Sequence, residues 1–331
     1  MICEFEHKIF LESGSSFDEQ ALELFRFQYQ HNQVYRMYVD TLHTDIAGIK
    51  LVENIPFLPI GLFKTQKVCT GDFEPELVFE SSGTTQTINS RHFVKDASLY
   101  TQSFNKAFEL FYGPARDWCI LALLPAYLER QNSSLVMMAE KLIKKSAHPQ
   151  SGFYLYDHEK LAGTIQKLEA EGQKTILIGV TFALLDFAEH FPMPLQHTVI
   201  METGGMKGRK EEMIREQVHA LLKKAFDVEM IHSEYGMTEL LSQAYSKGSG
   251  IFHCPPWMKV LIREEDDPFA VKKDAGTGVL NIIDLANIYS CAFIATDDAA
   301  RLYADGSFEV LGRVDNSDVR GCSLLMVSSE S

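Results

Sequence analysis

The short apolar run Thr175-Ile-Leu-Ile-Gly-Val180 contains no charged side chain. The runs Cys119-Ile-Leu-Ala-Leu-Leu124 and Thr198-Val-Ile-Met201 have the same character. Strands of a parallel sheet are covered by helices on both faces, so continuous apolar runs of this length are typical of them. Segments of helix length lie between and after these runs, at residues 133–145, 158–172 and 210–225. Strands that alternate with helices in this way predict an α/β fold built on a largely parallel sheet.

Further elements flank these runs. Ser16-Phe-Asp-Glu19 fits a capping box, in which the hydroxyl accepts an N–H group and the glutamate reaches back, so we expect one helix over residues 16–41. The stretch 55–64 contains two prolines, which favour an extended path over a helix. The other expected elements are strands at 77–79, 92–94 and 228–232, and helices at 96–112 and from about residue 240.

The pattern changes near residue 251. Short strands and turns follow, with β-rich runs at 260–263, 278–283 and 308–311 and a hairpin signal at Asp305-Gly306. No linker rich in proline, glycine or serine interrupts the chain. We therefore expect an α/β body over residues 1–250 and a β-rich subdomain over residues 251–331.

Composition narrows the class of protein. The chain has 331 residues, of which 46% are hydrophobic and 23% charged, enough for a large core and unlike a disordered protein. Its formal charge of −14 argues against a nucleic-acid or anionic-membrane binder. The apolar run 118–128 contains Pro125 and is too short to span a bilayer. The first residues show no signal-peptide pattern, so a cytoplasmic location is expected.

The cysteines indicate no disulfide framework and no structural zinc site. They are scattered along the chain, without a C-x-x-C pair, at positions 3, 69, 119, 254, 291 and 322. In a reducing compartment we expect free thiols, most of them buried as small apolar groups.

A small polar segment follows the expected strand at 77–79. Glu80-Ser-Ser-Gly-Thr-Thr85 offers several backbone N–H groups and hydroxyls around one glycine, which is how a loop cradles phosphate without much positive charge. A plain polar turn between two strands is the alternative. Two glycines after a buried strand, in Met201-Glu-Thr-Gly-Gly-Met206, would let a planar ligand approach the backbone, although a bare turn also explains them.

Two later segments carry further candidate ligands. In His232-Ser-Glu-Tyr-Gly-Met-Thr-Glu239, Thr238 could donate to a phosphate oxygen and Glu239 could bind a hard divalent cation, whereas the alternative is a helix N-terminus capped by Thr238. Thr296-Asp-Asp298 offers carboxylates that can bind both hydroxyls of a ribose, and Leu311-Gly-Arg-Val-Asp315 adds a guanidinium.

In this order and spacing, the segments resemble the adenylate-forming superfamily of acyl-CoA synthetases, adenylation domains and luciferase-type ligases, over about residues 55–322. The resemblance implies an α/β N-terminal body with mixed and parallel sheets, together with ATP and Mg²⁺ as cofactors. Its phosphate loop would be Ser81, Ser82, Gly83, Thr84 and Thr85, and its adenine-side turn Gly204 and Gly205.

The same resemblance assigns roles to the later motifs. Tyr235-Gly236-Met-Thr238-Glu239 matches the family's Tyr-Gly-x-Thr-Glu element, which implies Tyr235 beside the adenine, Thr238 at the α-phosphate and Glu239 at Mg²⁺. Asp298 falls at the position that binds the ribose, and Arg313 at that of a ribose-contacting arginine before the hinge. The family's usual Thr-Gly-Asp reads Thr-Asp-Asp here, which leaves open whether Asp297 or Asp298 binds the sugar.

One branch of the superfamily fits best. Most members continue into a small mobile domain with a catalytic lysine, whereas this sequence stops nine residues after Cys322, so we expect that domain to be absent. The sequence is most similar to the acyl-protein synthetase of bacterial bioluminescence systems, and also resembles phenylacetate-CoA-ligase-like enzymes. Members of the first group carry stretches like Pro56-Phe-Leu-Pro59 and Arg320-Gly-Cys322.

The resemblance implies a ligase. A fatty acid would be activated with ATP to an acyl-adenylate, and the acyl group would move to Cys322, where Arg320 favours the thiolate, and on to a partner protein, a reductase or carrier protein. A buried structural role for Cys322 is the alternative. An acyl- or aryl-CoA ligase, or a nucleotide-binding subunit without turnover, are the competing functions.

Overall fold

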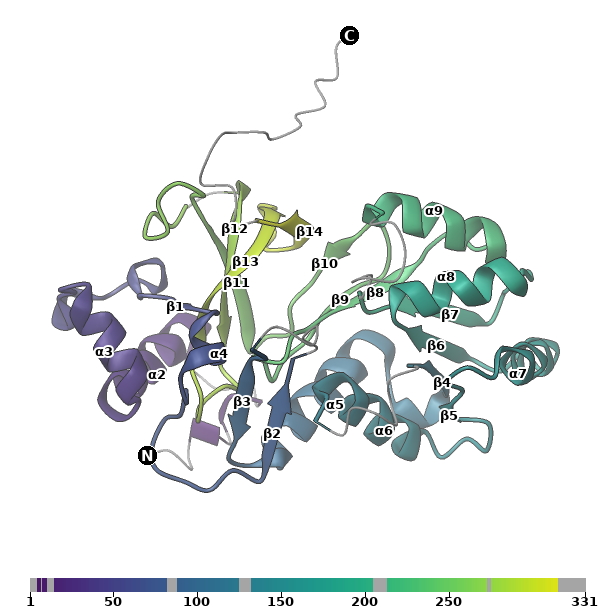
Figure 1. Cartoon of the computed structure of the whole chain (residues 1–331), viewed down its shortest axis with the longest axis horizontal. Helices are drawn as coiled ribbons and strands as arrows, with labels where there is room; N and C mark the ends of the chain where they lie inside the picture. Colours follow the sequence, from purple (N-terminus) through teal and green to yellow (C-terminus); the bar gives the residue numbers. More distant parts are fainter. Residues whose placement is uncertain are drawn as a thin grey trace, which may run out of the picture.

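A computed structural model of the chain describes residues 5–6, 8–10, 15–81, 88–124, 132–204, 213–272 and 275–314. Within them lie two large sheets, seen on the right and left of Figure 1, and a hairpin of β2 (Leu77–Glu80) and β3 (Arg91–Val94). The first, here called the parallel sheet, has the strand order β5-β4-β6-β7-β8-β9. The strands from β5 to β8 pair in parallel and β9 is antiparallel to β8. Their bounds are β4 Cys119–Leu123, β5 Gly152–Phe153, β6 Thr175–Gly179, β7 Thr198–Glu202, β8 His232–Tyr235 and β9 Ala244–Ser246.

Helices cover both faces of the parallel sheet, which confirms the predicted α/β architecture. In β4, Cys119, Leu121 and Leu123 face one core while Ile120 and Ala122 face the other, so every position of the strand is apolar. The helices on the first of these faces are α7 (His158–Ala170), α8 (Thr181–His190) and α9 (Arg215–Phe226), and those on the second are α5 (Ala97–Tyr112) and α6 (Ser134–Ser146).

The second large sheet, here called the antiparallel sheet, has the order β10-β14-β13-β12-β11. Its strands are β10 Ile251–Phe252, β11 Met258–Arg263, β12 Gly276–Asp284, β13 Phe293–Leu302 and β14 Phe308–Arg313. A strand from the beginning of the chain, β1 (Leu58–Pro59), adds to β13 in parallel. The strands expected after residue 251 are therefore present. The division into two domains at residue 250 stays a prediction.

The helix expected over residues 16–41 is two helices. The capping box at Ser16 and Glu19 is formed as predicted, but α2 (Phe17–His31) ends at Asn32 and α3 (Gln33–Thr41) begins after it. Asn32 has extended backbone and a buried side chain, whose amide donates to the carbonyl of Ser290 at 2.9 Å and to the hydroxyl of Thr70 at 3.2 Å. The break follows from a contact with a distant part of the chain, for which residues 16–41 carry no signal.

Three other boundaries differ from expectation. The helix predicted from residue 210 starts at Arg215, because Ile214 is extended. The strand expected at 228–232 begins only at His232. Residues 62–65 form a short helix, α4 (Leu62–Thr65), directly after the extended proline segment.

No helix begins near residue 240. The chain turns there instead, between β8 and β9, and the turn is held by the buried carboxylate of Asp284. That carboxylate accepts the backbone N–H groups of Leu241 at 2.8 Å and Ser242 at 3.0 Å, and the Ser242 hydroxyl at 2.6 Å. The apolar residues that suggested a helix, Leu240 and Leu241, are buried in the core as part of this turn.

Among the described residues, no helix has the length and apolar character that crossing a membrane requires.

Asn32 should contribute more to stability than an ordinary helix cap. The side-chain oxygen Oδ1 of Asn32 accepts the N–H of Tyr35 at 2.9 Å. Its side-chain NH₂ group donates to buried acceptors. We expect Asn32→Ala to lower the free energy of unfolding in urea by about 2–4 kcal/mol, from the lost cap and the unpaired buried groups. Asp157→Ala, which removes only an exposed cap on α7, should cost about 1 kcal/mol. Equal losses would contradict this role for Asn32.

Candidate active site

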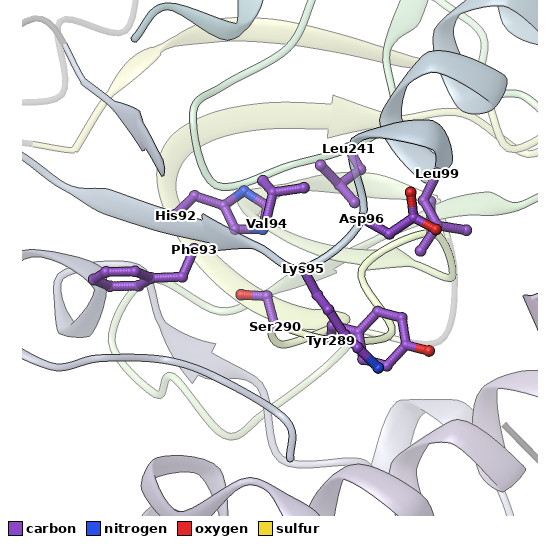
Figure 2. Close-up of a pocket in the computed structure, with 10 residues that line it drawn as sticks. His92, Phe93, Val94, Lys95, Asp96, Leu99, Leu241, Tyr289 and Ser290 are labelled. Atoms are coloured by element: carbon purple, nitrogen blue, oxygen red, sulfur yellow. The ribbon is translucent and has the colours of Figure 1, made fainter. Parts of the chain in front are cut away.

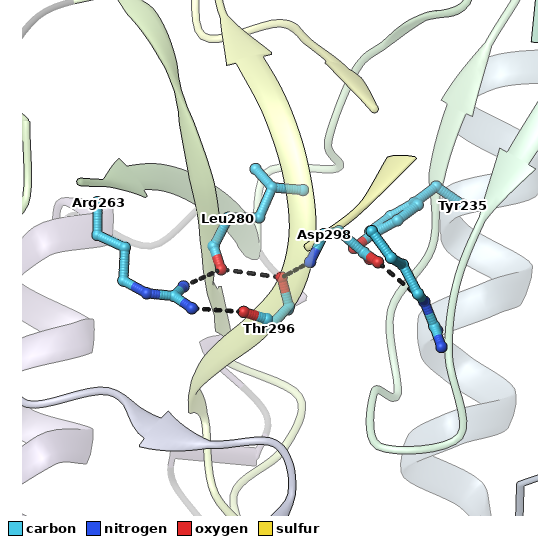
Figure 3. Close-up of polar contacts among 6 residues, drawn as sticks. Tyr235, Arg263, Leu280, Thr296 and Asp298 are labelled. Carbon is cyan, nitrogen blue, oxygen red and sulfur yellow. Dashed lines mark hydrogen bonds and ion pairs between the residues drawn. The ribbon is translucent and has the colours of Figure 1, made fainter. Parts of the chain in front are cut away.

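Three of the predicted site residues meet where the two large sheets face each other. Tyr235 ends β8, Asp298 lies on β13 and Arg313 ends β14 (Figure 3). The Tyr235 hydroxyl donates to Asp298 Oδ2 at 2.7 Å, and Arg313 Nε lies 3.4 Å from Asp298 Oδ1. Asp298 is 7% exposed, whereas the Arg313 side chain is 65% exposed. The cluster therefore has a buried carboxylate at its base and a solvent-facing cation at its rim.

Tyr235 is fixed as a hydrogen-bond donor. Its ring packs edge-on against Phe252 and Phe308, with centroids 5.8 and 5.4 Å away. Burial raises the pKa of Tyr235 well above its ordinary value, and the negative charge of Asp298 raises it further. The phenol consequently stays protonated and points its hydrogen at the carboxylate.

Only one of the two candidate aspartates joins this cluster. Asp298 is buried and binds Tyr235, whereas the negative charge of its half-buried neighbour Asp297 acts on Arg263 of β11. Asp298 is also the register partner of Arg313 across the β13–β14 ladder. The geometry thus selects Asp298 over Asp297 as the carboxylate beside Tyr235.

Glu239 lies near the same cluster, in the turn after β8. It is 5% exposed, and burial raises the pKa of its carboxyl, while a hydrogen bond from Ser90 and the positive charges of Arg313 and Lys64 oppose that rise. Arg313 thus acts electrostatically on both Asp298 and Glu239. A carboxylate in this setting is available to bind a cation.

Two buried side chains hold the backbone of this turn. Burial lowers the pKa of His92 to about 4, so its ring is neutral, and its Nδ1 lies 2.8 Å from the carbonyl oxygen of Thr238, to which it donates. Asn287 Nδ2 donates to the carbonyl oxygen of Glu239 at 2.8 Å. These bonds orient Thr238 and Glu239, which the sequence places side by side.

A small pocket lies on the far side of His92 (Figure 2). Val94, Leu241 and Tyr289 are among the side chains that line it, and Lys95 Nζ sits 3.9 Å from the centroid of the Tyr289 ring. The pocket is much smaller than a nucleotide. It belongs to the packing that supports the turn and is not itself a substrate site.

The base of the predicted phosphate loop is closed by two serines. Ser81 N donates to the carbonyl of Ser90 at 3.1 Å, and Ser90 N donates to the Ser81 hydroxyl at 2.9 Å. The Ser90 hydroxyl also bonds to Glu239, which links this pair of serines to the Glu239 carboxylate. Other predicted site residues lie outside the described residues: Ser82, Gly83, Thr84, Thr85, Gly205 and Cys322.

Gly204 stands at the end of β7, the strand beside β8. Its φ is +75°, a conformation that favours glycine. Its N–H donates to Glu202 Oε1 at 2.6 Å, and its carbonyl accepts the N–H of Thr181 at 2.9 Å. The predicted adenine-side turn is therefore tied to the first residue of α8 by backbone and carboxylate contacts.

Sequence reasoning missed Glu234, which precedes Tyr235 and is half-buried on the opposite face of β8. It pairs in register with Tyr245, and its charge also acts on Tyr100 and Tyr112 of α5. Burial, followed by the nearby Glu202, raises the pKa of Glu234 to about 8. A Cβ atom at Gly236 would lie 2.5 Å from Glu234 Oε1, so a larger residue there would require the Glu234 side chain to shift.

The described residues contain no group of three or more side chains that could hold a metal by themselves. Mg²⁺ normally uses only one or two protein carboxylates and takes its other ligands from phosphate and water. The buried Glu239 carboxylate, which accepts a hydrogen bond from Ser90, fits that pattern. A magnesium site of this kind would be completed by the nucleotide.

Comparison with known proteins agrees with this arrangement. A family model described as "Acyl-protein synthetase, LuxE" matches residues 12–330. The fold is similar to ATP-bound MatB from Rhodopseudomonas palustris, with 14% identity, a TM-score of 0.53, and coverage of 73% of this chain and 49% of that one. It is also similar to a 2-hydroxyisobutyryl-CoA ligase in complex with 2-HIB-AMP and CoA, with 13% identity, a TM-score of 0.64, and coverage of 90% and 68%.

The chain thus spans about half the length of the MatB chain it matches. No match was found among curated protein sequences. At these identities the structural likeness shows the fold, and it confirms the expected α/β body of adenylate-forming enzymes.

The raised pKa of Glu234 predicts a pH-dependent stability. Between about pH 4.5 and 8 the unfolded chain releases this proton while the folded chain keeps it, so stability falls as pH rises through that window. Relative to Glu234→Gln, the wild-type protein should lose up to about 1.4 kcal/mol of unfolding free energy per pH unit. Urea unfolding at pH 5.5, 6.5 and 7.5 measures this, with the exposed Glu216→Gln as control. Parallel curves for wild type and Glu234→Gln would exclude a protonated Glu234.

Proposed function

Since the chain belongs to the LuxE acyl-protein synthetase family, we propose that it activates a fatty acid with ATP and transfers the acyl group to a thiol. One observation carries the proposal. Tyr235, Asp298, Arg313 and Glu239, which come from distant parts of the sequence, gather where β8 meets β13 and β14. A hydrogen-bonded carboxylate, a cation and a second carboxylate at one place suit a nucleotide with its metal.

In the first step of this proposal, a carboxylate oxygen of the acid attacks the α-phosphorus of ATP. The bond to the β-phosphate oxygen breaks, and the products are an acyl-adenylate and pyrophosphate. Both reactants are anions, so the protein must offset their repulsion. We assign this role to the N–H groups and hydroxyls of residues 81–85, to the Thr238 hydroxyl and to the Arg313 guanidinium.

Mg²⁺, bound through Glu239, would neutralise charge on the phosphates. The Glu239 backbone is held by Asn287, and its carboxylate accepts a hydrogen bond from Ser90. Both contacts fix the carboxylate before any ligand arrives, so little reorganisation is needed at the moment of reaction.

The nucleoside would lie between β7 and β13 in this proposal. Asp298 would accept hydrogen bonds from the ribose hydroxyls, since a carboxylate has about four acceptor positions and Tyr235 occupies one of them. The ring of Tyr235 would border the adenine, and so would the turn at Gly204 and Gly205. Arg313, largely exposed, is able to swing onto the sugar.

In the second step, the Cys322 thiolate would attack the acyl carbon, the bond to AMP would break, and a thioester would form. The other thiols in the described part of the chain are poor candidates for this role. Burial raises the pKa of Cys69 and Cys119 to about 11 and of Cys254 and Cys291 to about 12, so they stay protonated at neutral pH. Arg320, two residues before Cys322, would instead favour a thiolate.

The acyl group would finally pass to a partner protein, a reductase or carrier protein. We place the reaction in the cytoplasm, where such thiols persist. Coenzyme A as acceptor, and nucleotide binding without turnover, are the outcomes that compete with this proposal.

Pyrophosphate–ATP exchange tests the activation step. Exchange should appear with at least one carboxylic acid from a panel of straight-chain, branched and aromatic acids. Glu239→Gln should reduce it by about 10²–10³-fold, because a charge-stabilising group near the phosphates is lost. Glu216→Gln, on the exposed face of α9, should leave exchange unchanged. If none of the acids supports exchange by protein that is shown to be folded, the proposed activity is refuted.

The acyl acceptor can be tested separately. Incubation with ATP, Mg²⁺ and the active acid should add one acyl mass that hydroxylamine removes, as expected of a thioester. Cys322→Ser should lose this label and keep pyrophosphate exchange, because the nucleotide site does not use the thiol. Cys254→Ser serves as the matched control and should keep both. Consumption of the adenylate by coenzyme A without any protein label would favour the CoA-ligase alternative.

A further inference from the structure

The Thr296-Asp297-Asp298 run lies in an irregular part of the antiparallel sheet. On one side of it Val279 pairs with Ala299, and on the other Asn281 pairs with Ala295. A single residue of β12, Leu280, therefore faces all three residues of the run. Such a bulge breaks the ladder of backbone hydrogen bonds and turns side chains in new directions, and bulges are frequent next to active sites.

Two backbone carbonyl groups at the bulge are bound by Arg263, the last residue of β11. Arg263 Nη1 donates to the carbonyl of Leu280 at 2.9 Å, and Nη2 donates to the carbonyl of Thr296 at 2.6 Å (Figure 3). Nη1 also donates to Asn281 Oδ1 at 2.9 Å. One guanidinium thus clamps both strands of the bulge, which the planar fork of an arginine can do and a lysine cannot.

The contacts continue from Arg263 to the candidate ribose carboxylate. The Thr296 hydroxyl donates to the same Leu280 carbonyl at 2.9 Å and accepts the backbone N–H of Asp298 at 3.2 Å. The Asp298 side chain then receives the hydroxyl of Tyr235. Hydrogen bonds therefore connect the buried Arg263, through Leu280 and Thr296, to the backbone N–H of Asp298, as the dashed lines of Figure 3 show.

Burial and charge explain why an arginine is tolerated there. Arg263 is 9% exposed, and burial lowers the pKa of its guanidinium while the negative charge of Asp297 raises it. The charge of Asp297 compensates the buried positive charge. The two aspartates therefore have different partners, Asp297 acting on Arg263 and Asp298 binding Tyr235 and Arg313.

We infer that Arg263 is a positioning residue for the nucleotide: it fixes the β13 bulge that aims the Asp298 carboxylate at the ribose. The inference rests on the proposed function, because it assumes that Asp298 binds the sugar of ATP. Arg263 itself touches no substrate in this arrangement. Its effect is carried by the Thr296 backbone and hydroxyl.

The orientation of the Asp298 carboxylate is tested by comparing ATP with 2′-deoxy-ATP and 3′-deoxy-ATP in pyrophosphate exchange. We expect the wild-type preference for ATP, as a ratio of kcat/KM values, to fall at least about tenfold in Arg263→Lys and Arg263→Gln, mainly through the KM for ATP. Arg263→Lys keeps the charge opposite Asp297 but lacks the fork, so it separates geometry from charge.

Leu168→Ala is the control for a purely structural effect. Leu168 is fully buried on α7, in the core on the far side of the parallel sheet, and its truncation should lower stability without changing the preference between sugars. All variants are compared at a temperature where urea unfolding shows them folded. Unchanged sugar preference in both folded Arg263 variants would overturn the inference.

The variant Asp298→Ala separates the role of Arg263 from the assignment of Asp298 as the ribose ligand. Loss of sugar preference in Asp298→Ala but not in the Arg263 variants would overturn only the role of Arg263. Retention of sugar preference in Asp298→Ala would overturn the assignment of Asp298 itself, and with it the nucleotide site proposed above.

Discussion

The buried carboxylate of Asp298 is one of the points at which the two large sheets of this protein are bound to each other. It binds a tyrosine from the parallel sheet and an arginine from its own sheet, and its position is set by a bulge in β13. A buried anion is costly unless it is paired, so these partners have to be present together. Arg313 at the rim and Tyr235, which packs edge-on against the stacked rings of Phe252 and Phe308, supply these partners.

Much of the fold can be read from the sequence because burial on two faces leaves a simple signature. The runs at 119–124, 175–180 and 198–201 are apolar at nearly every position, and they are the central strands of the parallel sheet. The errors have a shared cause. The break at Asn32 depends on Ser290, and the turn at 240–243 depends on Asp284. Neither partner is near in sequence, so local patterns favoured a longer helix in one place and a new helix in the other.

In the candidate site, too, some residues can be identified from local sequence patterns and others cannot. Short motifs identified Tyr235, Asp298, Arg313 and Glu239, because each belongs to a segment with a distinctive order of residue types, and the structure brings these four together. The supporting residues gave no such signal. Arg263 stands directly before the charged run 264–267 and reads as the start of a surface turn. Ser90 reads as an ordinary loop residue and His92 as an ordinary strand residue. Their importance arises only from bonds to Thr296, Glu239 and Thr238, which sequence spacing does not reveal.

The parallel pairing of β1 with β13 has a consequence for how the chain reaches its native state. Leu58 and Ile294 lie at opposite ends of the sequence, and the loop between them contains the entire parallel sheet. Closing so long a loop carries a large entropic cost and slows the pairing of its ends. During synthesis, the strands from β4 to β9 are available to pair well before β13 leaves the ribosome. The proposed nucleotide site needs β8 and β13 together, so it can form only after β13 has been synthesised.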